Sequence, residues 1–171
     1  RRTKATIAKE KGLEPLAALI MTFPKESIFK LAEGYLNEGL EVLSVEDALL
    51  GARDILAEQF ADDAKIREQI RNITRADGKI ITSVKKAELD EKNVFEMYYE
   101  YEEPVKKIVP HRILAVNRGE KEDILKVALQ VPMEKAANVM KTHWIKPSSS
   151  DAVEQIELAV EDSYKRLIQP S

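Results

Sequence analysis

The sequence predicts a mainly α-helical fold, a multi-helix bundle with helix-turn-helix character and a small two- or three-stranded β element. Apolar residues recur at three- and four-residue steps along several segments, which is the helical period. Glycine and proline are scarce, at 6 and 7 of 171 residues, and only two short segments alternate apolar with polar residues. The composition, 44% hydrophobic and 33% charged, is typical of a globular chain of one domain or two small lobes.

The first twenty residues predict two short helices. Thr3 or Thr6 is the expected N-cap of a helix that ends at Gly12, because glycine accepts the left-handed backbone that closes helices. Pro15 suits the first turn of a second helix through Met21. The pair resembles a helix-turn-helix, a pattern that many α-hairpins share.

The next two helices begin at serines. Ser27 is the expected cap of a short third helix. Ser44 with Asp47 is close to a capping box, and the apolar stripe that follows continues as far as Phe60. This segment is the clearest helix in the sequence.

The middle of the chain combines one more helix with two strands. Asp62 or Asp63 is the expected cap of a helix that ends at residues 77–78, and we expect this helix to pair antiparallel with the preceding one. Residues 80–84 and 125–131 then alternate with period two, which favours half-buried strands. We expect these two segments to pair.

Three further helices complete the prediction between and after the strands. Residues 104–108 and 110–118 are typical of short helices, the second closed by Gly119, and residues 133–144 form an amphipathic helix. Asp151 with Glu154 is expected to start the last helix. Because the preceding segment Lys146-Pro-Ser-Ser-Ser is typical of a linker, we predict a helical region with a small β element over 1–146 and a linker with a C-terminal helix over 147–171.

The sequence contains no motif for catalysis or for metal or cofactor binding. There is no cysteine, and the two histidines, His111 and His143, lie far apart without the spacing of a zinc site. The glycines are isolated, so no phosphate-binding loop is expected. The tyrosines and glutamates of residues 98–103 favour a solvated acidic surface with partly packed tyrosines rather than a catalytic carboxylate pair. We expect a non-enzymatic protein with no cofactor.

Clusters of basic residues are the remaining candidates for a binding site. The net charge of −3 argues against a chain dominated by nucleic-acid contact, yet the first thirty residues are basic. Phosphate contact needs positive charge without special geometry, which makes these residues candidate nucleic-acid ligands. They are Arg1, Arg2, Lys4, Lys9, Lys11, Lys106, Lys107, Arg112 and Arg118.

The sequence also bears on the setting of the chain. The longest apolar run, residues 16–21, is far shorter than the roughly 20 residues of a membrane helix, so no membrane association is expected. The lack of cysteine is compatible with the cytoplasm. The chain starts at Arg1 rather than at methionine, from which we expect a piece of a longer protein or a processed chain.

Four segments in collinear order carry a resemblance to a known family. They are residues 1–17 (RRTKATIAKEKGLEPLA), 48–58 (ALLGARDILAE), 101–122 (YEEPVKKIVPHRILAVNRGEKE) and 159–171 (AVEDSYKRLIQPS). Together they resemble the helical region that precedes the RNase H-like (YqgF) domain in the Tex family of bacterial transcription accessory proteins. The resemblance spans essentially the whole chain and depends on the ensemble, because no single segment is a mechanistic motif.

The resemblance implies a cytoplasmic bacterial protein that acts in transcription and contains several domains, including a C-terminal OB-fold that binds RNA. The implied partners are the remaining domains of the parent chain, RNA or DNA, and the transcription machinery. Two functions therefore stay open for this region. One is a non-catalytic helical scaffold of a nucleic-acid-binding protein, with or without its own contact to the DNA or RNA backbone. The other is a protein-protein or interdomain docking module with no nucleic-acid contact.

Overall fold

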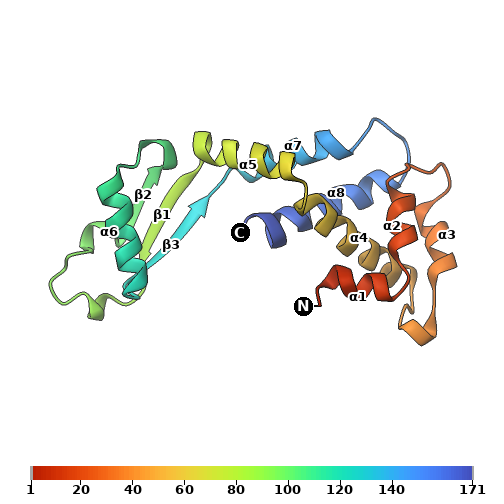
Figure 1. Ribbon diagram of the computed structural model, residues 1–171, viewed down its shortest axis with the longest axis horizontal. Coiled ribbons are helices and arrows are strands. Elements are labelled where there is room, and N and C mark those ends of the chain that lie inside the picture. Colours follow the sequence, from red (N-terminus) through yellow and green to blue (C-terminus); the bar gives the residue numbers. More distant parts are fainter. Residues whose placement is uncertain (1, 171) are drawn as a thin grey trace. The chain divides into compact units, whose positions relative to one another are not determined.

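A computed structural model describes residues 2–170, which form eight α-helices and one three-stranded sheet (Figure 1). They divide into two compact units, residues 2–68 with 137–170 (unit 1) and residues 69–136 (unit 2). The predicted fold class, mainly helical with a small sheet, is confirmed. The boundary predicted between 146 and 147 is a different division of the chain and stays a prediction.

Unit 1 is a helical bundle built around its longest helix. Its helices are α1 (Lys4–Glu10), α2 (Glu14–Ile20), α3 (Ile28–Ala32), α4 (Val45–Ala61) and α8 (Ala152–Asp162), the last continued by a π-helical turn (Ser163–Ile168). α4 packs against α1, α2, α3, α8 and the π-helical turn. Its apolar stripe is fully buried because neighbours cover it on several sides. Two further helices, α5 (Ala64–Asp77) and α7 (Met133–Trp144), belong partly to each unit.

Three helices begin at the predicted capping residues. Thr3 accepts a hydrogen bond from the third backbone N–H of its helix at 3.1 Å, Ser44 accepts the equivalent bond at 3.1 Å, and Asp63 does so at 3.0 Å. Each cap satisfies a backbone donor that the helix itself leaves unpaired, worth about 1 kcal/mol. The starts of α1, α4 and α5 are therefore set by their own local sequence.

Two further helices begin directly after the predicted residues, Ser27 and Asp151, but neither side chain caps its own helix. Ser27 stands at the cap position of α3, but its side chain makes no capping bond. The Ile28 N–H donates instead to both carboxylate oxygens of Asp151, at 2.9 and 3.1 Å, so Asp151 caps α3 rather than its own helix. Ser150 takes its place by accepting from the first N–H of α8 at 3.2 Å, and it donates to the Pro24 carbonyl at 2.6 Å. The two halves of unit 1 are joined at this point.

The expected antiparallel pairing of α4 with the next helix is also wrong. Among residues 2–170, α4 makes its main contacts with α1 and α8, and α5 is not one of its principal partners. Near its C-terminal end, the Phe60 ring stacks on Trp144 of α7 with ring centroids 4.2 Å apart. The helices that pack against α4 thus include α8, which is distant from it in sequence.

Unit 2 is a small antiparallel sheet with one helix. The strands are β1 (Lys79–Val84), β2 (Glu100–Pro104) and β3 (Leu125–Gln130), in the order β2-β1-β3. The predicted pairing of residues 80–84 with 125–131 is confirmed. β2 was not predicted, because residues 98–103 were interpreted as an acidic surface. Its Tyr101 lies opposite Thr82, which is flanked on the other side by Val127.

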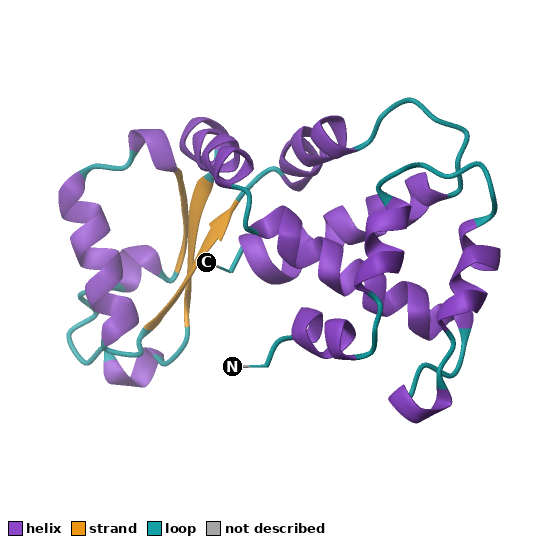
Figure 2. Cartoon of the chain, turned by 45° about the vertical axis from the view of Figure 1, so that its right-hand side comes forward, coloured by secondary structure: helices purple, strands orange, loops and turns teal. Residues whose placement is uncertain are grey.

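Helix α6 (Pro110–Lys121) packs on the sheet beside β3 (Figure 2). The predicted helix end at Gly119 is wrong, since α6 continues to Lys121 and buries Gly119 inside the contact with β3. Glycine is required there for space rather than for a turn. The buried side chains that form the core of this unit are Phe95, Tyr98, Val116, Ile124 and Leu125.

Candidate functional site

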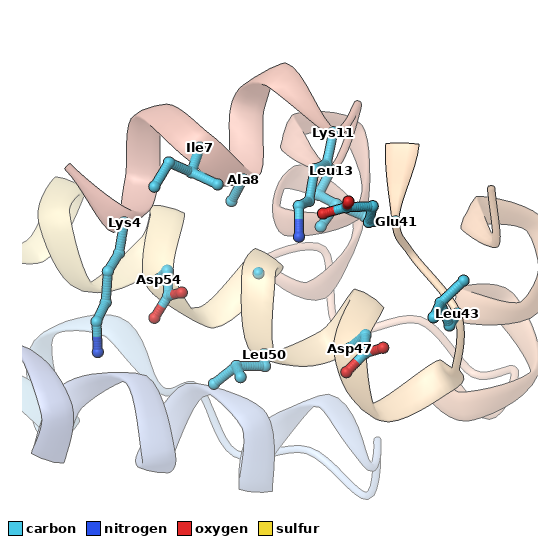
Figure 3. Close-up of a pocket in the computed structure, with 11 residues that line it drawn as sticks. Lys4, Ile7, Ala8, Lys11, Leu13, Glu41, Leu43, Asp47, Leu50 and Asp54 are labelled. Atoms are coloured by element: carbon cyan, nitrogen blue, oxygen red, sulfur yellow. The ribbon is translucent and has the colours of Figure 1, made fainter. Parts of the chain in front are cut away.

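An open pocket of about 410 Å³ lies between α1 and α4 in unit 1 (Figure 3). Figure 3 shows side chains of α1 on one side of it and side chains of α4 on the other. The lining residues are Lys4, Ile7, Ala8, Lys11, Leu13, Glu41, Leu43, Asp47, Leu50, Gly51 and Asp54.

The apolar part of this pocket is open to solvent. Leu43 is 66% exposed, Leu50 51% and Ile7 38%, although all three are large hydrophobic residues. Leu13 is fully buried beneath them and contacts the backbone at Gly51, where any side chain would displace it. A cluster of exposed aliphatic side chains over a closely packed floor is suited to binding another apolar surface.

The charged part of the pocket carries both signs. Lys4 and Lys11 come from α1 and its C-terminal cap, whereas Asp47 and Asp54 come from α4. Burial raises the pKa of Asp54, and the positive charges of Arg166 and Lys4 partly oppose this rise. Asp54 is therefore a half-buried carboxylate whose charge is balanced by groups on both sides. The lining as a whole carries both signs of charge, with two lysines and three carboxylates.

The predicted N-terminal cations differ in how they are engaged. Arg1 lies outside the described residues. Arg2 forms an ion pair at 2.6 Å with a glutamate of α1, and Lys9 forms one at 3.5 Å with a glutamate of α2. Within residues 2–170, Lys4 and Lys11 form no ion pair, and both line the pocket. These two are thus the N-terminal cations with charge available for a ligand.

The predicted cations of the middle segment all lie in unit 2. Arg112 forms an ion pair at 2.6 Å with Glu103, whose side chain is largely buried, and Arg118 pairs at 3.4 Å with Glu122 at the C-terminal cap of α6. Lys106 and Lys107 are exposed and form no ion pair with any residue from 2 to 170. The nine predicted residues thus do not form one cluster: those that are described fall into two groups, one in each unit. Their role in nucleic-acid binding stays a prediction.

A buried carboxylate that the sequence did not indicate organises the loop before β2. Asp90 accepts hydrogen bonds from the backbone N–H groups of Val94 and Phe95, both at 2.9 Å, and from the Tyr99 hydroxyl at 2.8 Å. Burial would raise the pKa of Asp90, but these three bonds outweigh it and lower the pKa. The same contact raises the pKa of Tyr99 to about 12. The role of this group is structural, because both of its carboxylate oxygens accept hydrogen bonds from residues 94–99.

Among residues 2–170, no group of three or more histidine, aspartate or glutamate side chains is arranged to hold a metal ion. The two histidines lie in different units, on α6 and α7. None of the helices among residues 2–170 combines the length and the apolar character that crossing a membrane requires. The pocket between α1 and α4 is accordingly the best-formed candidate site in the part of the chain that the structure describes.

Comparison with known proteins adds the evolutionary context. The family model described as Tex central region-like matches residues 24–165. The chain is 50% identical over 173 residues to the uncharacterized protein YdcI of Bacillus subtilis, covering 100% of this chain and 24% of that protein. It is 41% identical over 130 residues to the transcriptional accessory protein Tex of Neisseria gonorrhoeae, covering 76% of this chain and 17% of that protein. It is 30% identical over 182 residues to the human S1 RNA-binding domain-containing protein 1, covering 98% and 18%. The chain thus spans a quarter or less of the length of these relatives.

Proposed function

Since this chain belongs to the Tex family, through the central region of that family, we propose that it is a non-catalytic helical scaffold within a longer transcription accessory protein. The pocket between α1 and α4 is the surface on which another domain of that protein docks. On this proposal the protein is cytoplasmic, and its wider partners are the transcription machinery and RNA or DNA.

The exposed aliphatic side chains of the pocket carry the scaffold proposal. Leu43 and Leu50 both line the pocket and are both more than half exposed, which costs solvation free energy unless another surface covers them. Relatives four or more times as long supply further domains for that role. The mixed charges around the leucines suit a protein surface, which carries both signs, better than a polyanion.

Residue-level footprinting tests the docking surface. Hydroxyl-radical labelling of the 171-residue chain is compared with labelling of the complete Tex-family protein that contains it. We expect Leu43 and Leu50 to be labelled in the chain alone and protected in the complete protein. Leu114, which is 69% exposed on α6, is the matched control and is expected to be labelled in both. Equal labelling of the two pocket leucines in both proteins would refute docking at this pocket.

A direct contact with the nucleic-acid backbone is the second candidate function, supported by the four lysines among the predicted ligands that form no ion pair within residues 2–170, Lys4, Lys11, Lys106 and Lys107. Two relatives, a transcriptional accessory protein and an S1 RNA-binding domain-containing protein, favour a nucleic-acid setting. Phosphate contact by Lys4 and Lys11, or by Lys106 and Lys107, requires only such available charge.

Salt-dependent binding tests this second function. Fluorescence anisotropy of labelled single-stranded RNA and duplex DNA is measured with the chain at several salt concentrations. Replacing two contacting lysines by glutamine is expected to reduce the slope of log K against log salt by roughly 1.5. The matched control is Arg2→Gln with Lys9→Gln, because both cations are already paired with glutamates. If RNA and DNA fail to bind even at low salt, the scaffold function stands alone.

A further inference from the structure

The segment that leads from α3 into α4 is closed into a loop by one antiparallel bridge. Asn37 and Val42 exchange two backbone hydrogen bonds, each with 2.9 Å between nitrogen and oxygen. The Asn37 side chain also accepts a hydrogen bond from the Leu40 N–H at 3.2 Å. Glu41 adopts the left-handed backbone, with φ of 63°, that brings the chain back. Residues 36–43 are called the bridge loop below.

The two leucines that flank this bridge face away from the core. Side chains alternate between two faces along extended backbone, and Val42 points inward, since it is 1% exposed. Leu36, which has extended backbone, and Leu43 therefore lie on the outward face, where they are 44% and 66% exposed. Residues that flank a hydrogen-bonded antiparallel pair form a non-hydrogen-bonded pair, in which the two side chains come closest. Leu36 and Leu43 thus form one exposed apolar contact.

Leu43 connects this contact to the pocket between α1 and α4. Leu43 and Glu41 of the bridge loop line the pocket together with Leu50 of α4 (Figure 3). On α4, Leu50 follows Asp47 by three residues and precedes Asp54 by four, so the three side chains share one face of the helix. The bridge loop therefore extends the pocket with a second pair of leucine side chains beside acidic groups.

Carboxylates dominate the charge around these leucines. Residues 36–50 contain four carboxylates and no lysine, arginine or histidine. All four are exposed, and none forms an ion pair with any residue from 2 to 170. They are Glu38, Glu41, Glu46 and Asp47. The cations that line the pocket are Lys4 and Lys11, and the charge of Lys4 already acts on Asp54. Negative charge therefore remains in excess.

We propose that the segment that docks on this surface is a basic amphipathic helix of another domain of the same longer protein. Its aliphatic side chains cover Leu36, Leu43 and Leu50, and its lysine or arginine side chains lie beside the carboxylates of residues 36–50. An amphipathic helix in an apolar groove is a common mode of recognition. A strand does not fit, because a bridge of one residue pair offers no sheet edge to extend. This inference rests on the docking function proposed above and adds the chemistry of the partner.

Three synthetic peptides of equal length test that chemistry with the 171-residue chain. The first is an amphipathic helix of leucine and lysine, the second has glutamate in place of lysine, and the third has serine in place of leucine. We expect only the first to bind, with an affinity that falls as the salt concentration rises. Amide shifts in NMR spectra should locate its binding at residues 36–50. Failure of the first peptide to bind, equal binding of the second, or shifts confined to other residues would overturn the proposal.

Charge reversal at two matched positions tests the role of the acidic rim. Glu46 and Glu154 are both exposed glutamates in the first turn of a helix of unit 1, α4 and α8 respectively. Glu46→Lys and Glu154→Lys therefore lose the same interaction with a helix dipole, but only Glu46 lies beside the leucines. We expect Glu46→Lys to weaken binding of the leucine–lysine peptide roughly two- to thirtyfold and Glu154→Lys to leave it unchanged. Equal weakening by the two variants would contradict a basic partner at this surface.

Footprinting of the complete protein separates failure of this inference from failure of the docking function. We expect Leu36 to be protected there together with Leu43 and Leu50, and all three to be labelled in the 171-residue chain. Protection of Leu43 and Leu50 while Leu36 stays labelled would leave docking at the pocket intact and refute the part assigned to the bridge loop. Labelling of all three leucines in both proteins would refute the docking function as well.

Discussion

Substitution of Gly119 by alanine tests how α6 is held against the sheet. Gly119 lies within the helix, and a Cβ atom there would lie 2.8 Å from Leu125 Cγ and 3.2 Å from Phe95 Cδ1. Both neighbours are core residues, Leu125 being 1% exposed. Because the closest contacts include a branched carbon inside the core, the leucine as a whole has to move.

Two effects of opposite sign decide the size of the change. Replacing glycine by alanine inside a helix stabilises it by about 1 kcal/mol. Overpacking a closed core costs about 1–3 kcal/mol, and the sub-3 Å contact with a buried side chain places Gly119→Ala near the upper end. We expect a net loss of about 1–2 kcal/mol. Gly34→Ala is the matched control, since nothing lies within 4 Å of its Cβ position, and it is expected to gain about 0.4–1 kcal/mol.

Native-state hydrogen exchange measures both effects, because it reports a local free energy of opening for each unit. Exchange of the β1 and β3 amides gives the change in opening free energy caused by Gly119→Ala. Exchange of the α4 amides gives the corresponding change for Gly34→Ala. In the double variant Gly119→Ala/Leu125→Ala the shortened side chain relieves the clash. The double variant should therefore lose at least about 1 kcal/mol less stability than the sum of the losses of the two single variants. Stabilisation by Gly119→Ala equal to that of the control, or strict additivity with Leu125→Ala, would refute the packing argument.

Three further expectations concern titratable and buried polar groups. Asp90→Ala leaves two backbone N–H groups and the Tyr99 hydroxyl without their acceptor, so hydrogen exchange of the loop amides should accelerate roughly tenfold or more. Tyr99→Phe removes only one of these bonds and should accelerate exchange less. Equal acceleration by the two variants would contradict this. The two lysine ammonium groups bonded to Asp123 lower the pKa of its carboxyl to about 2. The ionised carboxylate therefore contributes to the free energy of unfolding above pH 3.8, the usual pKa of aspartate, and this contribution is lost as the pH falls toward 2. An NMR titration of its carboxyl carbon with a midpoint near 3.8 would show that the pairing is absent in solution. The buried Tyr164 hydroxyl has no hydrogen-bond partner among residues 2–170, so Tyr164→Phe should raise the free energy of unfolding by about 1 kcal/mol. Urea denaturation measures this change. A lower free energy of unfolding in the variant would reveal a partner for the hydroxyl.

The elements that local sequence could predict are those whose stabilising groups are themselves local. Thr3, Ser44 and Asp63 cap helices that begin one residue later, so a few neighbouring letters contain the whole interaction. The alternation that predicted β1 and β3 is equally local, and their pairing followed because no other strand pattern was evident. These predictions are confirmed for that reason.

The wrong predictions share a dependence on residues far along the chain. Asp151 resembles a cap for its own helix, yet the donor that it accepts from is 123 residues away. Gly119 resembles a helix end, yet its function is to admit Leu125, and β2 is hidden because its glutamates and tyrosines resemble an exposed surface. No local pattern contains these partners.

The candidate pocket was only partly visible in the sequence. Lys4 and Lys11 were among the predicted ligands, but Leu43 and Leu50 were not noticed. The available signal was for Leu50 alone, because it lies on α4 but outside the apolar stripe, and a large aliphatic residue outside such a stripe remains exposed unless something else covers it; Leu43 precedes the helix. That Arg2 and Lys9 form ion pairs whereas Lys4 and Lys11 do not could not be predicted, because it depends on where the side chains of Glu10 and Glu14 lie.

The division of unit 1 into two stretches of chain affects its biosynthesis. α4 emerges from the ribosome early, but α8 and the π-helical turn that cover it follow only after residues 69–136. At roughly 5–20 residues per second, this interval lasts several seconds. During that time the apolar stripe of the nascent α4 is a substrate for chaperones, and the sheet of unit 2 can close first. A nascent chain whose β3 has left the ribosome and whose α8 has not would therefore carry a sheet that is free to fold, attached to an unfinished helical bundle.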